Sequence, residues 1–529
     1  MHRNASVNAH SFAMVPKSDI PRSSFNMQKT LKTTFDSGFL VPIMCEEVLP
    51  GDTFNVKATM FGRLATPLFP VLDNLHLDSF FFFVPNRLIW NNWVKFMGEQ
   101  ENPSDSISYT IPQQVSPVGG YAVGSLQDYL GLPTVGQVGG ANTVSHNALP
   151  VRAYNLIYNQ WFRDENLQNS VTVDKGDGPD ATPATNYTIL RRGKRHDYFT
   201  GSLPWPQKGG TAVTLPLGTS APIKANGSGD YVTVLDNTST ARSLYIASSP
   251  SDLAMRTGTP GSGAKALYAD LSNATAATIN QLRQSFQIQK LLERDARGGT
   301  RYTEIIRAHF GVVSPDARLQ RPEYLGGGST PINITPIPQT SATGAGSTPL
   351  GNLAAYGTYL APGHGFSQSF VEHGYVIGLI SVRADLTYQQ GLRKMWSRST
   401  RYDFYFPVFA MLGEQAVLNK EIYCDGSSND SSVFGYQERW AEYRYNPSQI
   451  TGLFKSTSAG TIDPWHYAQK FASLPTLNST FIQDTPPLAR NLAVGAAANG
   501  QQLLLDAFFD IRAARPLPLY SVPGLIDHF

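Results

Sequence analysis

Two clusters of basic and aromatic residues carry side chains that can bind phosphates and bases. The first cluster, in the segment LRRGKRHDYF, consists of Arg191, Arg192, Lys194 and Arg195. The second cluster surrounds Trp396 and consists of Arg393, Lys394, Arg398 and Arg401. Basic side chains contact phosphates and aromatic rings stack on unpaired bases, so both clusters are candidates for binding single-stranded nucleic acid. A salt-bridged surface between subunits explains either cluster equally well.

Motifs for catalysis or metal binding are incomplete. Residues 258–265, GTPGSGAK, have the glycine spacing of a phosphate-binding loop, but Ala264 stands where its lysine belongs, so we interpret them as a surface loop. For the neighbouring pair His196 and Asp197, a structural hydrogen bond is a better interpretation than catalysis. The two cysteines lie far apart without a CxxC motif, which argues against a disulfide framework and a zinc site. We expect no enzymatic activity and no cofactor.

Composition predicts a β-rich chain with many turns. The 46 glycines and 36 prolines are typical of short strands joined by turns and long ordered loops. The net charge is only +2, so any basic surface must be local. The N-terminus lacks the apolar stretch of a signal peptide, and no apolar run approaches the ~20 residues of a membrane helix. We therefore expect synthesis in a cytoplasm without secretion or membrane insertion.

Strand patterns are scattered along the whole chain. Residues 53–60, TFNVKATM, alternate between apolar and polar side chains, and residues 505–513 do the same. Further strands are expected over about 74–84, within 370–388 and over 402–412. Together these patterns predict an all-β-dominated fold, an antiparallel β-sandwich with long loop and helical insertions.

The run FFFFV at residues 80–84 ends one of these strands. Phe80 and Phe82 would point to one face, and Phe81 and Phe83 to the other, so both faces need a cover. One face would pack inside the sandwich, and the other against helical insertions or a neighbouring subunit. These four residues and Trp93 are our candidates for subunit packing.

Apolar residues at helical spacing predict insertions between the strands. Helices are expected over about 86–97 and 151–164. A third helix, from Ile279, has apolar residues on two sides, so we expect partners on both. Residues 1–36 are basic and show no clear period, which suggests an extended N-terminal arm ahead of one domain over 37–529.

Four long segments occur in an order typical of one family. They are TTFDSGFLVPIMCEEVLPGDTFNVKATMFGRLATPLFPVLDNLHLDSFFFFVPNRLIWNNW, KRHDYFTGSLPWPQKG, LRQSFQIQKLLERDARGGTRYTEIIRAHFGVVSPDARLQRPEYLGG and PLPLYSVPGLIDHF. Together they resemble the major capsid protein of the Microviridae, in its gokushovirus branch. The arm segment SFNMQKTLKTTF departs from the family, because it lacks the expected Phe-Asp-Arg-Ser-His stretch.

The resemblance implies an eight-stranded jelly roll that assembles as sixty copies into a small T=1 icosahedral shell. The shell would enclose a circular single-stranded DNA bacteriophage genome, in a virion assembled in the host bacterial cytoplasm. The insertion at 208–275 would form a protrusion at the three-fold axes and serve host attachment. The residues selected there are Gly209, Asn226, Tyr231 and Gly258.

Charge and resemblance together predict partners. Each copy brings only two net positive charges. A genome that encodes this chain needs three nucleotides for each of its 529 residues, and each nucleotide carries about one negative charge, so the shell alone cannot neutralise it. A small basic DNA-packaging protein, polyamines or cations must supply the rest. The resemblance implies that protein, an internal scaffolding protein, a DNA pilot protein and a host surface receptor. The alternative, a secreted carbohydrate-binding or carbohydrate-cleaving jelly roll, would need a signal peptide and a pair of carboxylates in a groove.

Overall fold

The computed structural model describes residues 21–209, 213, 279–313, 320–341, 351–494 and 500–520, with short strands between 223 and 269. The chain forms two compact units. Residues up to Pro206 and from Thr300 onwards form the larger unit, and Gln207–Gly299 form the smaller one. Both cysteines are free. Among the helices that the structure describes, none combines the length and the apolar character that crossing a bilayer requires.

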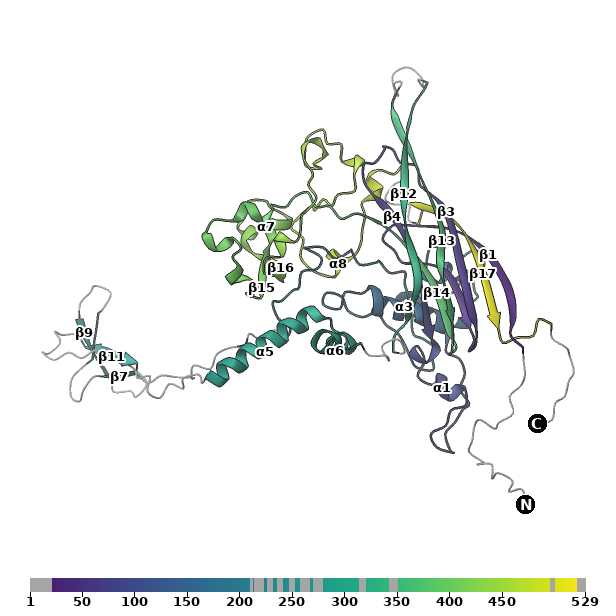
Figure 1. Cartoon of the computed structure of the whole chain (residues 1–529), viewed down its shortest axis with the longest axis horizontal. Coiled ribbons are helices and arrows are strands. Elements are labelled where there is room, and N and C mark those ends of the chain that lie inside the picture. Colours follow the sequence, from purple (N-terminus) through teal and green to yellow (C-terminus); the bar gives the residue numbers. More distant parts are fainter. Residues whose placement is uncertain are drawn as a thin grey trace. The chain divides into compact units, whose positions relative to one another are not determined.

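Eight antiparallel strands build the main sheet of the larger unit (Figure 1). They are β1 (Ser23–Phe35), β2 (Val41–Val48), β3 (Thr53–Leu64), β4 (Leu75–Pro85), β12 (Glu323–Pro338), β13 (Leu353–Ser369), β14 (Gly374–Ala384) and β17 (Leu503–Arg515). Their order is β1-β17-β3-β13-β12-β4-β14-β2, so the first of the eight strands pairs with the last and the second with the seventh. This order is that of a jelly roll, and it confirms the expected fold.

Strand β1 lies inside the segment that was expected to be an extended arm. All 13 of its residues pair with β17, from Ser23 opposite Arg515 to Phe35 opposite Leu503. Lys29 interrupts the apolar alternation of this segment, which concealed its strand period. The expectation of a separate arm was therefore wrong for Ser23–Phe35, because these residues find their partner at the opposite end of the chain.

The four phenylalanines of β4 divide between the two faces of the sheet as predicted. Phe81 and Phe83 point into the main core, where their ring centroids lie 5.4 Å from Phe366 and 4.7 Å from Phe370. Phe82 points to the opposite face and belongs to a second core. Both faces are thus covered within the chain.

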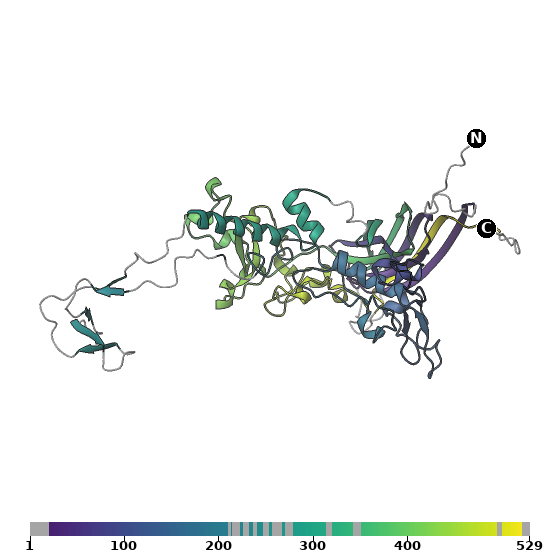
Figure 2. The same ribbon diagram turned by 90° about the horizontal axis from the view of Figure 1, so that it is seen from below.

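A helical insertion covers the second face of β4. Helix α3 (Leu149–Ile157) continues into a π-helical turn (Tyr158–Phe162), in place of the expected helix over 151–164. The rings of Trp161 and Phe162 lie 5.4 and 5.8 Å from that of Phe82. Figure 2 shows this helical segment against one side of the sheet.

These contacts argue against subunit packing for Phe81, Phe82 and Phe83, whereas for Phe80 and Trp93 it stays a prediction. Phe81, Phe82 and Phe83 are at most 6% exposed in the single chain, which leaves no surface for a neighbouring subunit. Phe80 is half-buried against Phe162, at 5.2 Å. Trp93 is also half-buried, among aromatic side chains of its own segment.

Two further expectations were wrong in detail. The helix expected over 86–97 is a 3₁₀ turn at Asn86–Leu88 and a single α-turn, α1 (Trp93–Phe96). Between the two, the Trp90 indole donates to Asp177 Oδ1 at 2.7 Å, a tertiary bond to the intervening chain. The strand expected over 402–412 consists instead of 3₁₀ turns at Arg401–Asp403 and Pro407–Phe409.

Shorter elements complete the larger unit. They are β5 (Gln113–Val115), α2 (Leu126–Tyr129), β6 (Ser145–Asn147), α4 (Pro183–Asn186), α6 (Tyr302–Phe310), β15 (Glu414–Leu418), α7 (Asn419–Ile422), β16 (Val433–Glu438) and α8 (Ser479–Ile482). The segment from Tyr388 to Ile482 contributes to a third, small core.

The smaller unit contains the whole of the expected insertion at 208–275. Its short strands are β7 (Ile223–Ala225), β8 (Val232–Leu235), β9 (Ala241–Ile246), β10 (Leu253–Arg256) and β11 (Leu267–Ala269). They form a three-stranded sheet, β10-β9-β8, and a two-stranded sheet, β11-β7. The unit also includes the predicted helix α5 (Ile279–Gly298). Its two apolar sides are open in the single chain, where Phe286 is 61% and Leu291 50% exposed.

Candidate nucleic-acid and assembly surfaces

Two arginines of the first basic cluster, Arg191 and Arg192, are engaged within the chain. Arg192 donates to Asp78 Oδ2 at 2.5 Å, and Arg383 donates to the same oxygen at 2.8 Å. Arg191 stacks 4.0 Å above the ring of Phe39. Burial alone would raise the pKa of Asp78, but hydrogen bonds from its partners, Arg192 first, hold that pKa below the ordinary value. The cluster therefore anchors its loop to β4.

Lys194 and Arg195 differ sharply although they are neighbours. Lys194 is buried, with its ammonium 4.3 Å from the ring centroid of Phe481, and burial lowers its pKa to about 8. Arg195 is exposed and lines a groove of about 490 Å³. Trp161 and Tyr324 line the same groove, and both rings are more than a third exposed. The groove thus combines a solvated guanidinium with accessible aromatic rings.

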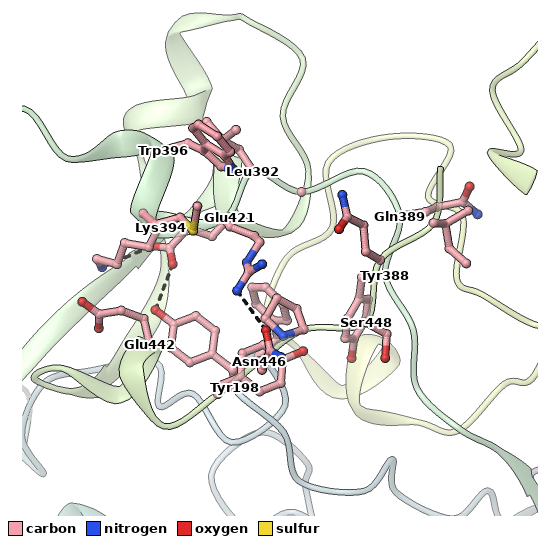
Figure 3. Close-up of a pocket in the computed structure, with 18 of the residues that line it drawn as sticks. Tyr198, Tyr388, Gln389, Leu392, Lys394, Trp396, Glu421, Glu442, Asn446 and Ser448 are labelled. Carbon is pink, nitrogen blue, oxygen red and sulfur yellow. Dashed lines mark hydrogen bonds and ion pairs between the residues drawn. The ribbon is translucent and has the colours of Figure 1, made fainter. Parts of the chain in front are cut away.

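Three residues of the second basic cluster, Arg393, Lys394 and Arg398, line a cavity of about 530 Å³. Lys394 donates to Glu421 Oε1 at 3.3 Å, and Tyr198 donates to Glu421 Oε2 at 2.9 Å. Figure 3 shows these three side chains pointing toward one another. Arg393 donates to Asn446 Oδ1 at 2.8 Å. Glu421 therefore connects Lys394 of the second basic cluster to Tyr198, which follows the first basic cluster in the sequence.

Aromatic side chains form the other walls of this cavity. The guanidinium of Arg398 lies 4.4 Å from the ring centroid of Tyr443 and pairs with Glu442 at 3.4 Å. Trp396 is 69% exposed, while Tyr445 stacks on Tyr198 with centroids 5.3 Å apart. Glu421 and Glu442 neutralise Lys394 and Arg398, whereas Arg393 has only an amide partner and Lys455 also lines the cavity, so the cavity keeps a moderate positive charge.

A buried carboxylate lies near the first cluster. Burial raises the pKa of Asp484 to about 6, although Arg192, Lys194 and other basic groups oppose the shift. Its backbone pairs with the cluster, because Asp484 N donates to Arg192 O at 2.8 Å. The sequence pattern missed Asp484, Asp78 and Glu421, since each is distant in sequence from the cations that it faces. The aromatic wall had a local signal, the alternation of Tyr443 and Tyr445 around a basic residue.

The segment from Met395 to Leu412 exposes many large apolar side chains. Met411 is 95%, Val408 82% and Tyr402 69% exposed. The remaining members, each at least 45% exposed, are Met395, Trp396, Phe404, Tyr405 and Leu412. Exposed apolar side chains gathered in this number indicate an interaction site.

The other predicted sites have different outcomes. Asp197 Oδ1 accepts from the amides of Phe199 and Thr200 at 2.9 and 2.8 Å, which supports a structural role for this acid. Among the selected attachment residues, Gly209 is exposed with φ near +101°. The three others lie outside the described residues, namely Asn226, Tyr231 and Gly258. No group of three or more potential metal ligands occurs in the described part of the chain.

Comparison with known proteins places the chain in a family. Residues 13–525 match the family model described as capsid protein (F protein). The chain is 49% identical to capsid protein VP1 of Bdellovibrio phage phiMH2K, over 99% of both chains. It is 43% identical to VP1 of Chlamydia phage 1, over 98% of both, and 38% identical to VP1 of Spiroplasma virus 4, over 98% of this chain and 97% of that one.

These relatives are structural shell proteins, so they support the expectation of a chain that is not an enzyme and do not favour the carbohydrate-binding alternative. Jelly-roll order, exposed apolar surface and full-length similarity lead to the same conclusion. The chain belongs to the capsid protein (F protein) family of the Microviridae, in its gokushovirus branch, and is the major capsid protein of a small single-stranded DNA phage.

Proposed function

We propose that sixty copies of this chain close into a T=1 icosahedral shell around a circular single-stranded DNA genome. The observation that carries the proposal is the exposed apolar segment from Met395 to Leu412, attached to a jelly-roll sheet. Burial of side chains such as Met411 against another copy stabilises the assembled state by about 25 cal/mol for each Å² of apolar surface removed from water. Assembly is then driven by these surfaces, while the sheet supplies a rigid wall.

The groove that carries Arg195 binds the genome, whereas most other residues of the two basic clusters do not. Arg192 and Lys394 already have acidic partners, and Lys194 is buried. Arg195 is exposed, and the ring of Tyr324 in the same groove, 44% exposed, offers a stacking surface for an unpaired base, whereas Arg321 already lies over the ring of Trp161. Arg191, Arg192 and Lys194 then hold the loop that presents Arg195.

Additional partners follow from charge. Sixty copies bring about 120 net positive charges, whereas coding for 529 residues takes roughly 1,600 nucleotides, each with about one negative charge. A small basic packaging protein, with polyamines or cations, supplies the difference. An internal scaffolding protein and a DNA pilot protein complete the particle, which assembles in the cytoplasm of the host bacterium.

The smaller unit is the best candidate for host attachment. Residues 208–275 interrupt the chain between β4 and β12, and their short strands form sheets separate from the main one. A segment that the jelly roll does not need for its own pairing is free to form the three-fold protrusion and to meet a host surface receptor.

Expression of the chain alone, followed by electron microscopy, tests the assembly proposal. Closed shells of sixty copies would show that the encoded interfaces suffice. Monomers or small oligomers would call for co-expression with the internal scaffolding protein of the same genome. Failure to form shells with that partner, although the chain is folded and soluble, would contradict the proposal.

A further inference from the structure

Strands β12 and β13 continue beyond the main sheet as a ribbon of two strands. Strand β4 pairs with β12 only as far as Leu75 opposite Ile332, and β3 pairs with β13 only from Arg63 opposite Thr358. Past these points Asn333–Pro338 and Leu353–Thr358 pair with each other. We call these twelve residues the ribbon; Figure 1 shows it extending past the ends of the neighbouring strands. Two strands alone are only marginally stable in water, so a ribbon of this kind gains from a partner.

The ribbon lies in a part of the sequence that contains no Asp, Glu, Lys or Arg. This charge-free stretch runs from Tyr324 to Val371, between Glu323 and Glu372, whereas such residues make up 16% of the whole chain. Charged residues are depleted in the core of protein interfaces, because their desolvation is costly. The ribbon also has no cation for a nucleic-acid phosphate, which argues against the genome as its partner.

One face of the ribbon exposes large apolar side chains. Pairing of Thr335 with Tyr356 and the alternation along each strand place Ile337 and Tyr356 on the same side, together with Leu360, which follows the ribbon on β13. Their exposed fractions are 45%, 39% and 58%. Phe61, opposite Leu360 on β3, extends this face and is 49% exposed. Asn333, Thr335 and Thr358 lie on the same side between these residues, and Arg63 of β3 lies opposite Thr358, so the side combines exposed apolar side chains with uncharged polar ones and has a cation only at its β3 border.

The β12 edge of the ribbon is closed to strand addition. Gln339 N donates to Asn352 O at 2.8 Å, and Gly351 N donates to Gln339 O at 2.9 Å, so odd-numbered residues of β12 bond to β13. Pro336 and Pro338 therefore occupy positions whose amides would point away from β13. Proline has no amide hydrogen to offer another strand at such an edge. Strand addition at this edge is therefore blocked, which favours docking through the exposed side chains of the face.

We propose that the ribbon docks, through the face formed by Ile337, Tyr356 and Leu360, onto a second copy of this chain. The inference deepens the proposed function and rests on it. A second copy presents surfaces of matching chemistry. One example is the segment from Phe404 to Gly413, which has no charged residue and includes the exposed Met411. Neutral apolar surfaces on both sides allow contact without the burial of unpaired charges.

A pair of double variants tests the proposal in the full-length chain, co-produced with the other proteins of its genome. Ile337→Lys with Tyr356→Lys places two charges on the face, whereas Ile337→Val with Tyr356→Phe preserves its apolar character. We expect the fraction of chain recovered in shells to fall at least tenfold for the lysine pair and to change less than twofold for the conservative pair. Both positions are exposed, so thermal unfolding of the unassembled chain should be unaltered.

A photo-cross-linking amino acid at position 356 provides the second measurement. In assembled shells we expect a product of twice the chain mass, with the linked peptide assigned to another copy. Cross-links only to DNA or to a different protein, or normal shell formation by the lysine pair, would overturn the ribbon proposal and leave the shell function intact. Absence of shells from the unaltered chain would overturn both.

Discussion

Replacement of Phe82 by alanine tests how the two faces of β4 are covered. The side chain is 1% exposed and lies within 6 Å of the rings of Trp161, Phe162 and Tyr324, measured between centroids. Loss of a buried phenylalanine costs about 3 to 5 kcal/mol, through lost transfer free energy and the cavity that remains. Typical domains are stable by only about 5 to 15 kcal/mol, so we expect Phe82→Ala to be largely insoluble.

Phe286→Ala is the matched control, because the same atoms are removed from a ring that is 61% exposed on α5. We expect this control to change stability by less than about 1 kcal/mol. The assay compares the soluble fraction of each variant and, where protein is recovered, hydrogen exchange of amides in β4 and α3. Equal solubility and equal protection of the two variants would refute the proposed packing of Phe82 beneath the helical insertion.

Three further predictions concern charges. Asp78→Asn removes the acidic partner of Arg192 and leaves Arg383 with Asp385 alone, so it should destabilise the chain by about 3 kcal/mol. Asp385→Asn, at a site 41% exposed, should cost less than about 1 kcal/mol, and thermal unfolding compares the two variants. Burial raises the pKa of Asp484 to about 6, so its ionised form is disfavoured in the folded state. The free energy of unfolding should therefore fall by about 3 kcal/mol as the pH rises from about 4 to above 6. In urea unfolding, Asp484→Asn should lack this part of the pH dependence. Arg195→Ala should weaken binding of single-stranded DNA in a filter-binding titration, and the slope of log affinity against log salt concentration should fall by about the value of one phosphate contact. An unchanged slope would contradict the groove assignment.

Local patterns predicted the faces of individual elements well. In β3 the alternating residues Phe54, Val56, Ala58 and Met60 are all buried, as their period of two indicated. The division of the phenylalanine run between two faces followed from the same geometry. Helices α3 and α5 were recognisable because apolar residues recur at helical spacing within one turn. Such patterns depend on a few neighbouring residues, which makes them readable in one sequence.

Long-range contacts decided the remainder of the fold. The strand role of Ser23–Phe35 depends on β17, which lies some 480 residues further along the chain, so its local pattern of lysines and threonines was misleading. The segment 402–412 alternates like a strand, but Pro407 and contacts between the segment and residues outside it favour 3₁₀ turns. Trp440, for example, donates through its indole to Phe409 O at 3.0 Å.

For the candidate sites, the sequence by itself determined which residues carry charge and where they cluster along the chain. Tertiary structure alone decided which of those charges remain available. Asp78 and Glu421 lie 114 positions before Arg192 and 27 after Lys394, and each neutralises its cation through the fold. Arg195 stays solvated next to the buried Lys194 because the loop turns one side chain inward and the other outward. Charge is a property of a residue, whereas its compensation and hydration depend on neighbours that only folding brings together.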